Sequence, residues 1–245
     1  MVQGYGVFGK AYETMLKNDL HAENSVDHRL MQKMILLEPA SYHFLYENVH
    51  PECSNMSNHN LYEFAQQLKD SQEVISVQNV MNFTSGIAKG FSCRLEEMLF
   101  GGTEKQILER GTNWCADMAR VTIVLFKCIG IPARLLYLAN PEVAYNGHVI
   151  TEVFYDGKYG VVDPLNGSAF YDKIPLNALI LMNNPGYLNN YPKEYRMLFR
   201  AAALSEYDPC DPSNDYSISG INDYYRRLLK TEHNGMWIMG EAAAG

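Results

Sequence analysis

Three residues of this sequence have the clearest capacity for chemistry: a cysteine, a histidine and an aspartate. Cys115 stands in "GTNWCADMARV", at the start of an expected helix. Free backbone N–H groups and the positive end of a helix stabilise a thiolate over a thiol and would also hold a developing oxyanion. His148 and Asp163 follow in two runs rich in β-forming residues. A carboxylate that orients an imidazole, which in turn serves a thiol, is an arrangement for nucleophilic catalysis.

The turn between the two β-forming runs predicts how His148 and Asp163 lie. Asp156-Gly157 favours a two-residue type I′ turn, which would place Ile150 opposite Asp163. His148 is two residues from Ile150 and therefore projects from the same face of its strand. The two residues become diagonal neighbours, with Cα atoms about 7–8 Å apart. The turn thus predicts a His–Asp pair that sequence separation alone hides.

Each of these residues also has a structural interpretation. A cysteine in an apolar helix is commonly a core residue, and Cys128, near the end of the same expected helix, receives that interpretation. A strand histidine is often only hydrogen-bonded, and an aspartate before proline commonly begins a turn. Zinc binding by the three residues is a further alternative, although no second histidine or C-x-x-C pair accompanies them. Their conjunction favours a catalytic triad of Cys115, His148 and Asp163.

The elements that must position these residues are a buried helix and an antiparallel sheet. The run 114–129 is almost wholly apolar, Asn113 is its expected N-cap, and Gly130 and Pro132 would end it. A capping-box pattern at Thr103 indicates a short helix before it. Further helices are expected over 10–37, 61–69, 73–82 and 103–111, with helical patches at 194–204 and 221–230. The residues 84–86 and 89–90 are expected to interrupt the chain after the helix over 73–82, and 50–60 is expected to be a loop. Strands are expected over 133–138, 148–155 and 158–163.

Composition excludes several classes of function. The chain has 245 residues, of which 47% are hydrophobic and 20% charged, and a net charge of −8, which suits a folded protein of one large domain or two small ones with a sizeable core. No Lys/Arg cluster exceeds a pair such as Arg226-Arg227, so neither a nucleic-acid partner nor an acidic membrane surface is expected. No apolar run approaches the roughly 18–20 residues that span a bilayer.

The cysteines and the first residues bear on the compartment. Five cysteines are widely spaced and form neither a disulfide framework nor a C-x-x-C pair. The first 15 residues, "MVQGYGVFGKAYETM", lack a basic start followed by an apolar segment, so no secretory signal is expected. Reduced thiols in a cytoplasmic protein are the simpler interpretation.

The stretches "GTNWCADMARVTIVLFKCIGIPARLLYL" and "GHVITEVFYDGKYGVVDP" resemble the transglutaminase-like domain of the papain-like superfamily. The shared motifs are a cysteine in a "G-x-C-x-D-x-A" helix start, a "G-I-P-A-R" segment, a "G-H" strand and a strand ending in "D-P". The resemblance covers about 95–172. It implies that Cys115 is the nucleophile, His148 the base or ion-pair partner and Asp163 the orienting carboxylate. It also implies an α+β fold, in which a buried helix carrying the cysteine packs on an antiparallel sheet, with no metal or organic cofactor.

The departures from the family pattern are mild. Tyr159 replaces the family's strand tryptophan, and the aromatic residue after the histidine is replaced at Ile150 or Thr151. We expect Arg120 or Arg134 to pair with an acidic residue. The further residues of the pattern that we interpret as structural are Asp117, Arg120, Pro132 and Arg134.

The resemblance implies thiol-dependent acyl transfer on an amide through a thioester. We expect a helical N-terminal region over 1–90, a catalytic core over 91–172 and an accessory C-terminal region over 173–245, together forming one compact domain. A cysteine peptidase or amidase acting on a peptide or small amide is the first hypothesis. A transamidase or acyltransferase with an amine acceptor is the second, and a non-catalytic peptide-binding domain is the third. The second oxyanion donor is left open among Asn113, Trp114, Gln78, Asn79 and Asn82.

A difference in thiol reactivity follows from these assignments. Near neutral pH, iodoacetamide should alkylate Cys115 much faster than Cys128, because only the former lies at a helix start beside an imidazole. Peptide mass spectrometry after timed labelling measures both rates. Equal or slower labelling of Cys115 would exclude it as the nucleophile.

Overall fold

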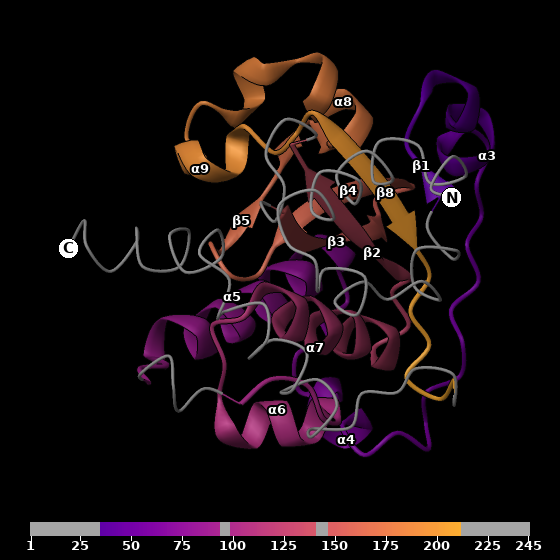
Figure 1. The fold of residues 1–245 in the computed structure, drawn as a ribbon. Helices are drawn as coiled ribbons and strands as arrows, with labels where there is room; N and C mark the ends of the chain where they lie inside the picture. Colours follow the sequence, from indigo (N-terminus) through magenta and orange to yellow (C-terminus); the bar gives the residue numbers. More distant parts are fainter. Residues whose placement is uncertain (1–34, 94–98, 141–146, 212–245) are drawn as a thin grey trace.

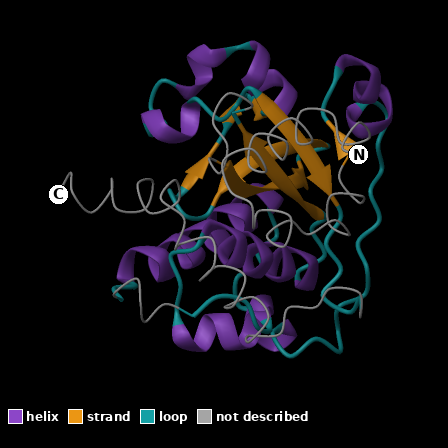
Figure 2. Ribbon diagram, viewed as in Figure 1, coloured by secondary structure: helices purple, strands orange, loops and turns teal. Residues whose placement is uncertain are grey.

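The computed structural model describes residues 35–93, 99–140 and 147–211. In this part the fold is α+β, with helices on both faces of an antiparallel sheet (Figures 1 and 2). The sheet has the order β1-β8-β2-β3-β4-β5, and β6 and β7 form a separate pair. The strands are β1 Ile35–Leu36, β2 Ala133–Ala139, β3 Gly147–Tyr155, β4 Lys158–Asp163, β5 Ser168–Ala169, β6 Tyr171–Asp172, β7 Ile174–Pro175 and β8 Ala201–Ser205.

The helices divide between the two faces of the sheet (Figure 1). Helices α4, α5, α6 and α7 lie on one side, and α8 and α9 lie on the other. None of the described helices is both long and apolar enough to cross a bilayer. The helices are α3 Tyr42–Tyr46, α4 Tyr62–Gln66, α5 Glu73–Gly90, α6 Glu104–Arg110, α7 Cys115–Cys128, α8 Ala178–Asn183 and α9 Lys193–Arg196, with 3-10 helices η2 Pro39–Ser41 and η4 Pro185–Leu188.

The β3–β4 hairpin confirms the predicted turn and register. Asp156 and Gly157 both have positive φ, 51° and 73°, as a type I′ turn requires. Tyr155 pairs with Lys158, and the register continues along the two strands. Because side chains alternate along a strand, the turn decides which face each residue of β3 occupies.

The two faces of β3 contact different hydrophobic clusters. Val149 and Val153 pack with the cluster that contains α7, whereas Ile150 packs with α8, η4 and α9. His148 has the same parity as Ile150 and therefore faces the C-terminal segment. The predicted His–Asp pair thus lies on the side of the sheet opposite α7.

Helix α7 is the buried central helix that the sequence predicts, and 12 of its 14 residues are buried. Its start differs by one residue from the expectation. Trp114, in an extended conformation, is the N-cap, and its N–H donates to the Thr112 hydroxyl at 3.0 Å. Asn113 is exposed and does not cap the helix. Cys115 is therefore the first helical residue, no side chain caps α7, and the Thr112 hydroxyl instead holds the N–H of the N-cap residue Trp114.

Several local predictions are confirmed. Thr103 and Gln106 form the capping box of α6, and Gly111 ends that helix with a φ of 76°. Helix α4 lies within 61–69, and β2 begins where predicted. These elements depend on caps and turns that a short stretch of sequence encodes.

Helix α5 continues through the expected break at 84–86. The Thr84 hydroxyl donates to the carbonyl of Val80 at 3.0 Å, and the Ser85 hydroxyl donates to that of Asn82 at 3.4 Å. These polar side chains satisfy their hydrogen bonds within the helix. Because Thr84 and Ser85 are also buried, packing outweighs their low helical propensity. The expected second break at 89–90 coincides with the end of the helix.

Two helical predictions are wrong where strands join the main sheet. Of the helix expected over 10–37, residues 10–34 lie outside the described residues, and Ile35–Leu36 form β1. Of the patch expected over 194–204, α9 ends at Arg196, and β8 begins at Ala201. Strand β8 pairs with both β1 and β2, so inter-strand hydrogen bonding overrides the helical propensity of its alanines. The patch at 221–230 lies outside the described residues.

Arg134 confirms the expected pairing with an acidic residue. Its Nη2 donates to Glu152 Oε2 at 2.7 Å, and both side chains are buried. Tyr46 donates its hydroxyl to Glu152 Oε1 at 2.8 Å. The Arg134 guanidinium also lies 3.7 Å from the ring centroid of Tyr159, the residue in the place of the family's tryptophan. Tyr159 therefore keeps an aromatic surface for this cation.

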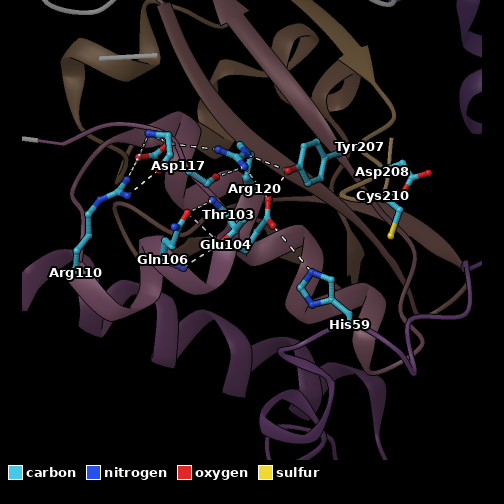
Figure 3. A network of polar contacts seen from close by, with 12 residues as sticks. His59, Thr103, Glu104, Gln106, Arg110, Asp117, Arg120, Tyr207, Asp208 and Cys210 are labelled. Atoms are coloured by element: carbon cyan, nitrogen blue, oxygen red, sulfur yellow. Dashed lines mark hydrogen bonds and ion pairs between the residues drawn. The ribbon is translucent and has the colours of Figure 1, made fainter. Parts of the chain in front are cut away.

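A second buried network ties the start of α7 to α6 (Figure 3). Arg110 donates to Asp117 Oδ2 at 2.8 Å, and Arg120 donates to Glu104 Oε1 at 2.9 Å. The Arg120 Nε donates to the Tyr207 oxygen at 2.9 Å. Asp117 lies in the first turn of α7 and Glu104 in the first turn of α6. The network therefore fixes the helix end that carries the cysteine.

The buried Arg134–Glu152 pair predicts a large stability effect. Arg134→Met should lower the free energy of unfolding by about 3–5 kcal/mol, because it leaves the Glu152 carboxylate buried without its cation. Lys105→Met is the control, since Lys105 and Glu109 form an exposed pair at 3.9 Å that contributes little. Urea unfolding measures both variants. A loss no larger than that of the control would contradict the assignment.

Candidate active site

His148 and Asp163 form a buried pair on neighbouring strands. The distance from His148 Nε2 to Asp163 Oδ2 is 2.8 Å. Their exposed fractions are 1% and 0%. The hairpin thus brings together the two side chains that its predicted register makes diagonal neighbours. At this burial an ion pair is stable only when further hydrogen bonds satisfy its atoms.

The Asp163 carboxylate has those further hydrogen bonds. Its Oδ1 accepts from the backbone N–H of Leu165 at 2.9 Å and of Asn166 at 3.3 Å, in a local turn. Its Oδ2 accepts from the Asn166 side chain at 2.7 Å and from the hydroxyl of Tyr191. Burial raises the pKa of Asp163, but the charge of His148 and these donors outweigh burial and lower it. The carboxylate is therefore fixed in orientation and ionised.

The imidazole of His148 is held as a cation. Burial lowers its pKa, but the Asp163 carboxylate and the Cys115 thiol together outweigh burial and raise it to about 10. The nitrogen Nδ1 has no hydrogen-bond partner within normal geometry among the described residues. Because Asp163 occupies Nε2, Nδ1 is the ring nitrogen that remains for a reacting group.

Cys115 is the third predicted residue, and it lies beside the same imidazole. It is half-buried at the start of α7, and its proximity is among the causes that raise the pKa of His148. The first backbone hydrogen bond of α7 runs from Met118 N to Trp114 O at 2.9 Å. The amides of residues 115–117 precede that bond and point toward the helix start. The structure thus brings Cys115, His148 and Asp163 together from three elements.

Two tyrosines of the site were not among the residues predicted from the sequence. Tyr191 contacts Asp163, and the Tyr195 ring stacks on His148 with centroids 4.2 Å apart and an interplanar angle of 29°. Tyr191 lies between η4 and α9, Tyr195 lies within α9, and both are buried. Their only signal in the sequence is a spacing of four residues around Pro192, which does not point to β3 or β4.

Two of the upstream amides suggested as oxyanion donors, those of Gln78 and Asn79, are engaged elsewhere. The Gln78 side chain donates to Asn82 Oδ1 at 2.9 Å, and the Asn79 side chain donates to the carbonyl of Leu68 at 3.2 Å. The backbone of Trp114 and Asn113 adjoins Cys115 and stays a candidate. No group of three or more His, Cys, Asp or Glu residues in the described ranges could hold a metal ion.

The charged state of His148 predicts a pH-dependent stability. The folded pKa of about 10 lies above the ordinary value of 6.5, so the folded chain binds more protons between these values. The free energy of unfolding that the pair contributes is complete below about pH 6.5 and falls as pH rises toward 10. Asp163→Asn should flatten this fall, because it removes the carboxylate that holds the imidazolium. Urea unfolding of both proteins between pH 6.5 and 10 measures how the free energy of unfolding depends on pH. Equal slopes of this free energy against pH in the two proteins would contradict the ion pair.

One of three comparisons with known proteins gives a match. Residues 62–164 match the model of the transglutaminase-like superfamily, and the match contains Cys115, His148 and Asp163. Searches of curated proteins and of solved structures found no match. Domains of this superfamily generally carry out cysteine-dependent acyl transfer or hydrolysis. Residues 62–164 therefore carry a transglutaminase-like domain.

Proposed function

We propose that this protein is a thiol-dependent hydrolase of amides, a cysteine peptidase or amidase, with Cys115 as nucleophile, His148 as acid and base, and Asp163 as the orienting carboxylate. The observation that carries the proposal is the buried His148–Asp163 pair, whose imidazole is also influenced by Cys115. Burying a charged pair is costly unless it is fully hydrogen-bonded, so its position beside a helix-start thiol supports a functional role.

The proposed reaction begins with attack of the Cys115 thiolate on the carbonyl carbon of an amide. A carbon–sulfur bond forms, and the carbonyl electrons move to oxygen. When the oxyanion collapses, the carbon–nitrogen bond breaks, and the His148 imidazolium gives its proton to the departing amine. The product at this stage is a thioester on Cys115 and a free amine.

Water then resolves the thioester. The neutral His148 removes a proton from water, the resulting hydroxide adds to the thioester carbon, and the carbon–sulfur bond breaks. The carboxylic acid leaves, and the thiolate–imidazolium pair is restored. The amides at the start of α7 precede its first helical hydrogen bond and would stabilise both oxyanions.

The substrate class in this proposal is a peptide or a small amide. If an amine instead of water attacks the thioester, the same residues perform transamidation. A domain that only binds peptides would need neither a thiol at residue 115 nor a charged imidazole beside it. The identity of the acceptor thus separates the two enzymatic alternatives, whereas thiol dependence separates both from binding alone.

Replacement of the nucleophile tests the proposal. Cys115→Ala should abolish release of aminomethylcoumarin from a panel of peptide amides while leaving the melting temperature close to that of the wild type, because Cys115 is only half-buried. Cys128→Ala is the matched control from the other end of α7 and should retain turnover. Adding a primary amine to the wild type, with mass spectrometry of the products, identifies the acceptor. Turnover retained by Cys115→Ala would rule the mechanism out.

A further inference from the structure

An aromatic cluster from the C-terminal half of the chain covers the His148–Asp163 pair. Phe170, Tyr191, Tyr195 and Phe199 are all buried. The centroid of the Tyr191 ring lies 5.2 Å from that of Phe170 and 6.0 Å from that of Phe199. This cover keeps water from the sheet face that carries the pair, and the low local dielectric strengthens each hydrogen bond within it.

Tyr191 links this cover to the ion pair by a hydrogen bond. Its hydroxyl donates to Asp163 Oδ2, the same oxygen that accepts from His148. With the three donors from Leu165 and Asn166, the carboxylate accepts five hydrogen bonds. A carboxylate offers about four lone-pair positions, so no position is left for a proton on Asp163. The transferable proton is thereby confined to His148.

The Tyr191 hydroxyl is a permanent donor. Burial and the neighbouring Asp163 charge raise the pKa of Tyr191 well above its ordinary value, so the phenol stays protonated wherever the pair is charged. Donation draws negative charge on Oδ2 away from the imidazolium. A weaker counter-charge leaves His148 a stronger acid.

We propose that Tyr191 is a positioning residue of the triad, which through Asp163 sets how tightly His148 holds the proton that it must give to the leaving amine. Tyr195, stacked on the imidazole, fixes the plane in which Nδ1 points. This inference rests on the proposed function. Among the described residues, the titratable groups that face His148 are Asp163 from β4, Cys115 from α7 and Tyr195 from α9, and Tyr191 acts through the first of these.

The charge beside Cys115 is measurable with two reagents of equal chemistry and different charge. An imidazolium attracts iodoacetate but not neutral iodoacetamide, so the ratio of their alkylation rates at Cys115 reports the proton on His148. In the wild type the ratio should be high at neutral pH and fall as His148 deprotonates, around pH 10. Peptide mass spectrometry reads the ratio at this cysteine alone.

The variants are chosen to move the fall in opposite directions. Tyr191→Phe keeps the ring and removes the donor, so the pH at which the ratio of alkylation rates falls should rise by about one unit. Tyr191→3-fluorotyrosine makes the hydroxyl a stronger donor and should lower the pH at which the ratio falls. Because this variant keeps the hydroxyl, it also serves as the test if Tyr191→Phe folds poorly. Tyr46→Phe is the control, because it removes a similar hydrogen bond from tyrosine to a carboxylate, at Glu152, and should leave the fall in place.

The outcomes separate this inference from the proposed function. If the ratio falls at the same pH in the wild type and in both variants at position 191, the role of Tyr191 is overturned and the triad is left intact. If Tyr46→Phe shifts the pH of the fall as much as Tyr191→Phe does, the role of Tyr191 is also overturned, because the shift is then a general consequence of lost stability. A wild-type ratio with no preference for iodoacetate at any pH would overturn the proposed function and this inference with it.

Discussion

The buried ion pair between His148 and Asp163 is the interaction on which the arrangement of this protein depends. Two charges removed from water cost several kcal/mol each unless their remaining atoms are hydrogen-bonded. The chain satisfies them with local donors at Leu165 and Asn166 and with a distant donor at Tyr191. The β3–β4 hairpin, the turn after β4 and the segment before α9 thus all converge on one carboxylate.

The cysteine reaches this pair from the other layer of the structure. Helix α7 packs on the opposite face of the sheet, and its first residue lies beside an imidazole that faces α9. Such an approach tolerates little movement of the helix start. The contacts of Asp117 with Arg110 and of Arg120 with Glu104 hold that end to α6 (Figure 3). Buried charges that play no direct part in the proposed chemistry therefore contribute to it by placing the nucleophile.

Much of the site can be predicted from the sequence, because its geometry is local. The Asp156-Gly157 turn determines the register, and the register determines that His148 and Asp163 share a face. What the sequence does not reveal depends on distant contacts. Tyr191 and Tyr195 belong to the segment that precedes β8, and β8 lies in the sheet between β1 and β2. The alanine-rich sequence of β8 predicts a helix, because alanine has high helical propensity. Hydrogen bonds from the neighbouring strands β1 and β2 make it a strand.

The most direct test of the account is the far-ultraviolet absorbance of the thiolate at neutral pH, compared among the wild type, Cys115→Ala and His148→Ala. The account predicts a thiolate band in the wild type that is lost to the same extent in both variants, because in the proposed mechanism the His148 imidazolium stabilises the thiolate of Cys115. Circular dichroism of each variant checks that the fold is retained. A wild-type spectrum that matches that of Cys115→Ala, or a band that persists without His148, would contradict the ion pair at the centre of the proposed mechanism.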